Sequence, residues 1–242
     1  MRLEVDITAK AFKRASRKQH EALAAIRFSL AAGEIGVFFG PSGCGKSTLL
    51  RILAGLDQDF EGTISRPADA RIGMVFQEPR LLPWRSVEDN VRLAAPLADE
   101  ATLSALFSVL ELNVHRGHFP GELSLGLARR VALARAFAVE PDFLILDEPL
   151  TSLDQALAAR MRDQIATLVA NRSALTVLVT HDLDDAVRLG DRLFLLSPRP
   201  ATIIAELSVR TPRSARGEAE VAAIKREIVR WTNGDRTDQD AS

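Results

Sequence analysis

The feature that most constrains this chain is a glycine-rich segment, Gly40-Pro-Ser-Gly-Cys-Gly-Lys-Ser-Thr48. Gly40, Gly45, Lys46 and Ser47 have the spacing of a Walker A phosphate-binding loop. An apolar run, residues 35–39, comes before the segment, and the apolar spacing of an amphipathic helix follows it over residues 46–56. A chance match to the four fixed positions has a probability on the order of 0.002, so a simple glycine turn is a weak explanation. The sequence therefore predicts a strand, a phosphate-binding loop and a helix in succession.

The loop has the residue types that hold a polyphosphate. Its glycines let successive backbone N–H groups turn toward the phosphates, and the helix N-terminus adds partial positive charge. Lys46 supplies a mobile charge to the β- and γ-phosphates, and the Ser47 hydroxyl can ligate Mg²⁺. Cys44 is interpreted as a small filler rather than a redox group. The predicted phosphate-binding residues are Gly40, Pro41, Ser42, Gly43, Cys44, Gly45, Lys46, Ser47 and Thr48.

Short apolar runs alternate with longer helical patterns along the chain, which predicts an α/β fold. The clearest strands are residues 35–39, 143–146, 176–179 and 193–196, and apolarity on both faces suits a parallel sheet covered by helices. Residues 97–112 and 127–139 also have helical spacing, while strand signals are sparse between Val87 and Arg135. We therefore expect a helical insertion in the sheet domain. Residues 11–26 are weakly patterned and basic.

Three parts of one domain follow from these patterns. The core is expected to comprise residues 1–85 and 136–212, and the helical subdomain residues 86–135. A C-terminal helix and tail, 213–242, complete the chain, with Val221, Ile224 and Ile228 on one helix face and a polar end from Asn233.

Two carboxylates end the apolar run Phe143-Leu-Ile-Leu-Asp-Glu148. In isolation such a pair is most often a solvated turn, and His181, which follows residues 176–179, would be an ordinary strand-end histidine. A phosphate-binding loop in the same sheet changes the interpretation, because Asp147 can then face Mg²⁺ and Glu148 an attacking water. His181 is predicted to reach the γ-phosphate.

Charge and composition exclude several classes of protein. The net charge of −1 argues against a basic nucleic-acid footprint. The single cysteine, Cys44, excludes an intramolecular disulfide framework and a cysteine-based zinc site. Charges interrupt every apolar run before the roughly 18–20 residues of a membrane span, and the N-terminus lacks the apolar stretch of a secretory signal. These observations predict a soluble cytosolic protein without a nucleic-acid partner.

Lysine is scarce in the chain. Of 31 basic residues only five are lysines, and Lys46 is the single lysine between Lys18 and Lys225. Drift toward arginine explains the scarcity itself, but the phosphate site gives this lysine a chemical reason to remain.

With these motifs in place, the chain resembles an ATP-binding cassette subunit of a transporter over about residues 3–207. Besides the phosphate-binding loop and the acid pair, the resemblance rests on Gln77, the signature segment Leu123-Ser-Leu-Gly-Leu127, Ser152-Leu-Asp154 and Thr180-His-Asp182. It implies a P-loop NTPase fold of the RecA-like type, with a parallel sheet, an antiparallel β edge and an inserted helical subdomain. It also implies that the cofactors are ATP and Mg²⁺.

The resemblance further implies a head-to-tail dimer, in which each ATP lies between one protomer's phosphate-binding loop and the other's signature segment. Ser124 and Gly126 would bind the ATP of the opposite protomer, and Asp154 would communicate across the dimer. The implied catalytic residues are Glu148, His181 and Gln77, and the implied metal ligands are Ser47, Gln77 and Asp147. Phe12 looks like the aromatic residue that stacks on adenine, a position where the family often has tyrosine.

The signature segment departs from the family's usual Leu-Ser-Gly-Gly-Gln, because Leu125 and Leu127 replace a glycine and the glutamine. A Cβ at Leu125 adds bulk beside a ligand and restricts positive φ. We therefore expect slower ATP turnover than with glycine, unless Leu125 packs against apolar neighbours and changes nothing.

The segment Gly73-Met-Val-Phe-Gln-Glu-Pro-Arg-Leu-Leu-Pro-Trp84 and the segment Leu196-Ser-Pro-Arg-Pro200 are similar to importers of the nitrate, sulfonate and taurine group. The implied partners are a second ATP-binding subunit, identical or paralogous, an integral membrane permease and, indirectly, a solute-binding protein, with the chain at the cytoplasmic face of the inner membrane. Exposed Leu81, Leu82 and Trp84 are expected to form an apolar docking floor for the permease, with Arg80 and Arg85 at its rim, unless they pack onto the helical subdomain. Two alternatives stay open: a lipid-trafficking transporter subunit and a non-hydrolysing, nucleotide-dependent adaptor.

Overall fold

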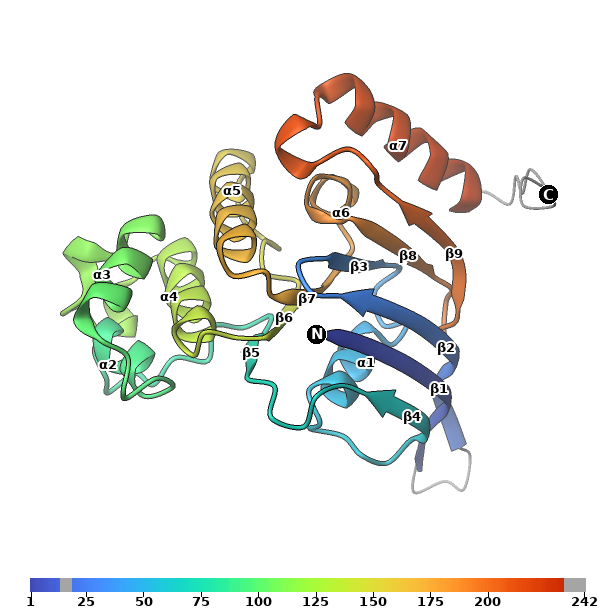
Figure 1. The fold of residues 1–242 in the computed structure, drawn as a ribbon, viewed down its shortest axis with the longest axis horizontal. Coiled ribbons are helices and arrows are strands. Elements are labelled where there is room, and N and C mark those ends of the chain that lie inside the picture. The colour runs from blue at the N-terminus through green and yellow to red at the C-terminus, as the bar shows by residue number, and fades with distance from the viewer. Residues whose placement is uncertain (14–18, 233–242) are drawn as a thin grey trace.

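A computed structural model describes residues 1–13 and 19–232 of the chain. Its central sheet has six strands in the order β5-β6-β7-β3-β8-β9 (Figure 1). The first five run parallel and the last pairs antiparallel with its neighbour, so the predicted α/β fold with an antiparallel edge is confirmed. The strands are β3 (Ile35–Phe39), β5 (Ile72–Val75), β6 (Phe143–Asp147), β7 (Leu175–Thr180), β8 (Arg192–Leu196) and β9 (Ile203–Ser208).

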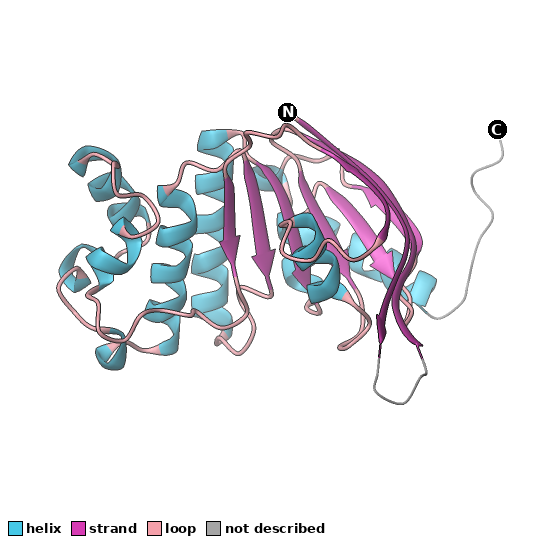
Figure 2. Ribbon diagram, turned by 90° about the horizontal axis from the view of Figure 1, so that it is seen from below, coloured by secondary structure: helices cyan, strands magenta, loops and turns pink. Residues whose placement is uncertain are grey.

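Helices cover both faces of this sheet (Figures 1 and 2). Along β6, Phe143 and Ile145 belong to the apolar cluster of α1 (Lys46–Leu53), whereas Leu144 and Leu146 belong to the cluster of α5 (Gln155–Arg172) and α6 (Leu183–Leu189). Successive side chains of a strand point to opposite faces, so a strand covered on both sides must be apolar throughout. For this reason the central strands could be recognised in the sequence as short apolar runs.

A second, antiparallel sheet covers the outer side of α1, in the order β2-β1-β4. Its strands are β1 (Arg2–Lys13), β2 (Gln19–Ala31) and β4 (Glu61–Ser65). Leu3, Val5 and Ile7 alternate with exposed or half-exposed residues and are buried against α1. The weak pattern over residues 11–26 has a structural cause, because the register of β1 against β2 shifts between Lys10 and Ala11 and interrupts the alternation.

The helical segment between β5 and β6 extends away from the sheet, at the left of Figure 1. It contains α2 (Val87–Arg92), α3 (Glu100–Val109) and α4 (Leu125–Ala138), with 3₁₀ turns at Asn113–His115 and Pro120–Glu122. The side chains of Ser86, Asp99 and Ser124 cap the three helices. Because Asp99 caps α3, this helix begins later than the expected residue 97. α4 continues past the expected subdomain boundary at residue 135.

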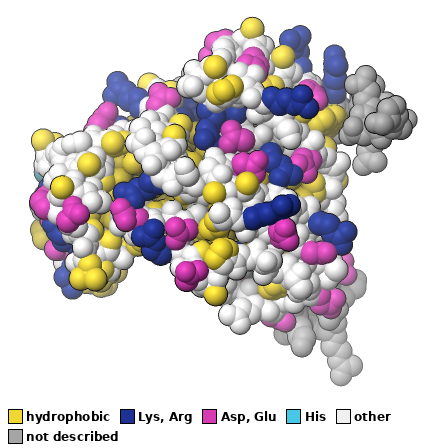
Figure 3. Space-filling view, viewed as in Figure 1, with side chains coloured by type: hydrophobic (Ala, Val, Ile, Leu, Met, Phe, Trp, Pro, Cys, Tyr) yellow, Lys and Arg dark blue, Asp and Glu magenta, His cyan; other side chains and the backbone are white. Residues whose placement is uncertain are grey.

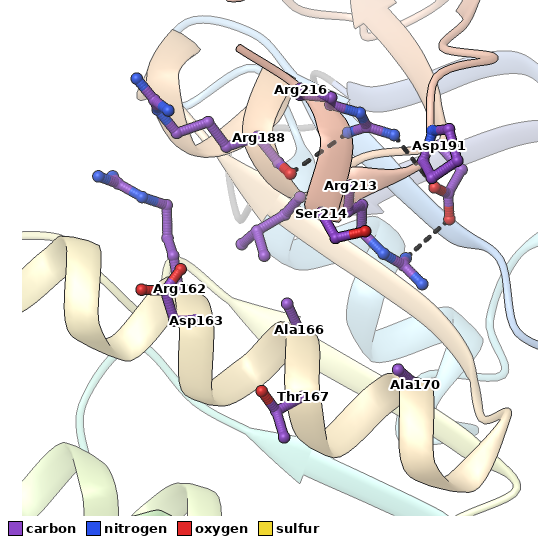
Figure 4. Close-up of a pocket in the computed structure, with 12 residues that line it drawn as sticks. Arg162, Asp163, Ala166, Thr167, Ala170, Arg188, Asp191, Arg213, Ser214 and Arg216 are labelled. Atoms are coloured by element: carbon purple, nitrogen blue, oxygen red, sulfur yellow. Dashed lines mark hydrogen bonds and ion pairs between the residues drawn. The ribbon is translucent and has the colours of Figure 1, made fainter. Parts of the chain in front are cut away.

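The chain ends, within its described part, in a 3₁₀ turn, Arg213–Ala215, and α7 (Glu218–Thr232). Two arginines attach this segment to the start of β8: Arg213 and Arg216 both bind Asp191, at 2.8 and 3.2 Å (Figure 4). A cavity of about 620 Å³ lies between α5 and this segment. The predicted polar end from Asn233 lies outside the described residues.

Basic and acidic side chains are interspersed over the face in Figure 3. None of the helices described is both long and apolar enough to cross a membrane.

Candidate functional site

Four of the predicted functional segments meet because they follow parallel, neighbouring strands. The glycine-rich loop follows β3, Asp147 ends β6, His181 follows β7, and Gln77 comes two residues after β5. In an open α/β sheet the carboxyl ends of parallel strands share one edge, where ligands bind. The topology therefore brings together residues that are more than a hundred positions apart.

The glycine-rich loop is held between β2 and the chain after β8. Gly45 has φ of 137°, and a Cβ there would lie 2.8 Å from the Ala22 carbonyl oxygen. Only glycine tolerates both the positive φ and the close approach. Cys44 is buried in the core beneath the loop, as expected of a filler, so its side chain is unavailable to a ligand.

Lys46 is buried at the base of the loop. Its Nζ donates to the carbonyl oxygens of Gly40 and Pro41 at 2.8 and 3.0 Å, and lies 3.7 Å from a carboxylate oxygen of Glu148. Two carbonyl acceptors and a carboxylate aim the ammonium along the loop. Phosphate oxygens entering the loop would meet a positioned charge.

Ser47 and Asp147 bring a hydroxyl and a carboxylate together at the glycine-rich loop. The Ser47 hydroxyl donates to Asp147 Oδ1 at 3.3 Å. Burial raises the pKa of the Asp147 carboxyl, and the neighbouring Glu148 charge raises it further. Among the described residues, no cluster of three or more His, Cys, Asp or Glu side chains could hold a metal by itself. One carboxylate and one hydroxyl suit Mg²⁺, which is held through few protein ligands together with phosphate oxygens and water.

Glu148 lies at the centre of a hydrogen-bond network. His181 Nδ1 is 2.9 Å from its Oε2, and the Thr151 hydroxyl donates to the same oxygen at 3.1 Å. Its backbone has φ of 46°, a left-handed conformation that costs on the order of 1–3 kcal/mol in a residue other than glycine. A carboxylate held in this way can accept a proton from a water beside the phosphates.

A cavity of about 490 Å³ runs from the glycine-rich loop to Phe12. Phe12 is 40% exposed, and Lys10 Nζ lies 4.8 Å from its ring centroid. The structure therefore brings Phe12 into one cavity with the loop, Gln77 and Glu148. The lining residues are Phe12, His20, Ala22, Ser42, Gly43, Gly45, Lys46, Ser47, Thr48, Gln77, Glu148 and Arg199.

The signature segment and Asp154 do not line this cavity. Ser124 caps α4 by accepting a hydrogen bond from Leu127 N at 3.3 Å, and Asp154 caps α5 in the same way through Leu157 N. Gly126 is buried where a Cβ would lie 2.5 Å from a Leu157 methyl carbon, so its small size lets α4 approach α5. These caps are roles that the sequence motifs did not indicate.

Leu125 is the first residue of α4, and it is 47% exposed. Its φ is not positive, so the expected backbone restriction does not arise. The Leu125 side chain is also not buried among apolar neighbours. Its difference from glycine is therefore the extra bulk that it presents at the surface.

Sequence reasoning missed the residues that hold the segment after Gln77. The buried Asn90 side chain bonds the backbone of Leu82 at both its N–H and its C=O, and Arg135 donates to the carbonyl oxygens of Pro79 and Arg80. Asn90 could have been noticed as an amide inside an amphipathic helix. Arg135 gave no sequence signal, because its partners are more than fifty positions away.

Comparison with known proteins identifies the class to which this fold and site belong. The family model described as ABC transporter matches residues 23–151. The solved structure of the ATP-binding cassette MJ0796, a dimer in a post-hydrolysis state bound to ADP and Pi, is 27% identical, with a TM-score of 0.75 over 87% of this chain and 100% of that one. The chain belongs to the ABC transporter family, and it is an ATP-binding, ATP-hydrolysing subunit.

Relatives with a more specific description match most of the chain. The aliphatic sulfonates import ATP-binding protein SsuB 2 of Pseudomonas syringae pv. tomato is 40% identical over 94% of this chain and 96% of its own length. The aliphatic sulfonates import ATP-binding protein SsuB 1 of Pseudomonas aeruginosa is 42% identical over 86% of this chain and 89% of its own. These relatives do not favour the lipid-trafficking alternative.

Replacement of Leu125 by glycine is expected to raise the ATPase rate several-fold, because it removes an exposed side chain from the segment predicted to meet ATP in a dimer. Steady-state phosphate release by the purified protein measures this. Leu97→Gly is a suitable control, since Leu97 is 96% exposed on the helical segment outside the signature. A Leu125→Gly rate no higher than that of the unmodified protein would show that the leucine has no effect on turnover.

Proposed function

We propose that ATP hydrolysis by this chain drives import of an aliphatic sulfonate, or a related small anion such as nitrate or taurine, through a membrane permease. The observation that carries the proposal is the 40% identity, over 94% of the chain, to an aliphatic sulfonates import ATP-binding protein. The substrate would be bound by the permease and a solute-binding protein, whereas this chain would contact nucleotide and permease from the cytoplasmic face of the membrane.

The arrangement of the glycine-rich loop, the acid pair and Gln77 around one edge of the sheet supports the following roles. Lys46 would bind the β- and γ-phosphates, and Ser47, Asp147 and Gln77 would hold Mg²⁺, which neutralises phosphate charge. Glu148 would take the proton of the attacking water. His181, whose Nδ1 lies 2.9 Å from Glu148 Oε2, would bind the γ-phosphate.

A head-to-tail dimer would complete the site. Ser124 and Leu125 are exposed, and neither they nor Asp154 line their own chain's nucleotide cavity, which fits a role toward a second protomer. The related cassette structure is described as a dimer. A second copy of this chain or a paralogous subunit would place its signature segment over the phosphates.

Reconstitution tests the proposed transport. The chain is purified with its permease from solubilised membranes and placed in liposomes, with MgATP on its side and ethanesulfonate plus the solute-binding protein on the other. We expect ATP-dependent uptake of the sulfonate. Movement of labelled phospholipid without sulfonate uptake would instead make this a lipid transporter, and ATP binding without any hydrolysis would make it an adaptor.

The predicted permease-docking surface is smaller than the sequence suggested. Leu81 is half-buried and packs against the main core, as the packing alternative expected, and Leu82 is also half-buried rather than exposed. Both side chains lie in the segment that Asn90 holds against α2, whereas Trp84 is 70% exposed. Trp84 is therefore the apolar anchor that remains.

Replacement of Trp84 by alanine is expected to reduce co-purification of the permease about tenfold or more, since aromatic anchors dominate the energetics of protein interfaces. The ATPase rate of the isolated chain should not change. Val114→Ala is a matched control, because Val114 is 79% exposed on another surface turn of the helical segment. Recovery of the permease at the same yield with Trp84→Ala would count against this interface.

A further inference from the structure

The nucleotide cavity contains a second basic side chain that the sequence motifs did not assign. Arg199 lines it together with Phe12, His20 and the glycine-rich loop. It belongs to the segment between β8 and β9, more than 150 positions from the loop, so the fold rather than a motif places it there.

Hydrogen bonds to β2 determine where Arg199 lies. Its Nε donates to the Glu21 carbonyl oxygen at 2.9 Å. Two residues on, Ala201 N donates to the Ala22 carbonyl oxygen at 3.0 Å, and Ala24 N donates to the Ala201 carbonyl oxygen at 2.9 Å. The segment therefore runs along β2 as a short parallel bridge, and the Arg199 side chain is tied at its Nε.

Strand β2 locates Arg199 relative to Phe12 and the glycine-rich loop. His20 pairs with Phe12 on β1, and Gly45 of the glycine-rich loop approaches Ala22 and Leu23. Glu21, which holds Arg199, lies between these two points on a strand that rises about 3.3 Å per residue. Glu21 is one residue from His20 and one residue from Ala22, so Arg199 is tied between the strand position opposite Phe12 and the glycine-rich loop.

The positive charge of the Arg199 guanidinium can act on a ligand in the cavity. Across residues 1–13 and 19–232, no carboxylate forms an ion pair with it, and only its Nε has a hydrogen-bond partner. The arginines of the larger cavity differ, because Arg213 and Arg216 both form ion pairs with Asp191 (Figure 4). Arg162 and Arg188, which also line the larger cavity, are ion-paired too, whereas Arg199 has no such partner within the described residues.

We infer that Arg199 is a nucleotide-binding residue that contacts the base and ribose of ATP, opposite the aromatic ring of Phe12. A guanidinium is flat and weakly hydrated, so it packs well on the face of an aromatic base. Phe12 and Arg199 then form the two sides of a clamp for the nucleoside. The inference rests on the proposed placement of ATP between Phe12 and the glycine-rich loop.

Equilibrium binding to the full-length chain carrying Glu148→Gln, which prevents hydrolysis, tests the clamp. MgATP and Mg-tripolyphosphate are titrated by calorimetry into this parent and into Arg199→Ala, Arg199→Gln and Arg226→Ala versions of it. Arg226 is the matched control, because it is an exposed arginine on α7 that does not line the cavity. We expect both Arg199 variants to bind MgATP about tenfold more weakly, with tripolyphosphate affinity unchanged. Arg226→Ala should match the parent.

Each other outcome has a definite meaning. Equal weakening of both ligands would place Arg199 at the phosphates, or show a damaged loop, and either would overturn the clamp. Unchanged MgATP affinity would also overturn it. If the Glu148→Gln parent binds tripolyphosphate as tightly as MgATP, the nucleoside contributes no affinity. That result would contradict the placement of ATP against Phe12, and therefore the proposed site as a whole rather than the role of Arg199 alone.

Discussion

Replacement of Glu148 by glutamine is expected to lower the ATPase rate by about 10²- to 10⁴-fold while leaving MgATP binding intact, because it removes the proposed general base without changing the shape of the side chain. The amide can still bond His181 and Thr151, which contact Oε2 in the native protein at 2.9 and 3.1 Å. The loop and Lys46 would keep their positions. Steady-state phosphate release and calorimetric ATP binding measure the two properties separately.

Glu227→Gln is the matched control, because Glu227 is exposed on α7 and does not line the nucleotide cavity. Its rate should equal that of the native protein. A Glu148→Gln protein that retains turnover within about threefold would show that another group takes the proton from water, and the assigned role of Glu148 would fail.

Replacement of Lys46 by arginine is expected to reduce kcat/KM for ATP by about a hundredfold or more, although the charge is conserved. The ammonium of Lys46 occupies a buried position between two carbonyl oxygens at 2.8 and 3.0 Å. A guanidinium is larger and planar, with its donors in a rigid fork, and it cannot occupy the same space between a turn of backbone and a phosphate. Initial rates over a range of MgATP concentrations give kcat and KM.

Lys225→Arg provides the comparison, since Lys225 is partly exposed on α7 and pairs with Asp184 at the surface. We expect that variant to hydrolyse ATP normally, because a surface cation tolerates the change. Near-normal turnover of Lys46→Arg would mean that this lysine has no special chemistry. The scarcity of lysine in the chain would then reflect only drift toward arginine.

Local patterns predicted much of the fold. The four strands expected from apolar runs all exist, and their bounds differ by at most one residue at either end, because strands buried on both faces contain few polar side chains. The long hairpin of β1 and β2 was missed. The alternation of buried and exposed side chains is interrupted by the register shift between Lys10 and Ala11. The preference of a segment for a strand also depends on the partner strand against which its side chains pack.

In the helical segment, the spacing of apolar residues predicted the helices but not where each one begins and ends. The absence of strands between Val87 and Arg135 was predicted, but α3 begins at a capping aspartate rather than at the first apolar residue. The subdomain bounds stay a prediction, and α4 continues across the expected one. Leu81 was expected at the surface because neighbouring residues looked like a docking motif. Its partial burial depends on hydrogen bonds that Asn90 and Arg135 form with the neighbouring backbone. A short stretch of sequence around Leu81 does not reveal these bonds.

The sequence by itself determined the phosphate-binding unit, because strand, loop and helix are contiguous and glycine, lysine and serine at this spacing have few other uses. It also determined the family, through an ordered set of short motifs. Only the tertiary structure decided which residues share the cavity. Parallel strand order brings Gln77 and Glu148 to the loop and His181 beside Glu148, and the bridge between Ala201 and β2 brings Arg199 into the cavity that Phe12 lines. Such contacts depend on strand pairing over long separations, which local patterns of side chains do not specify.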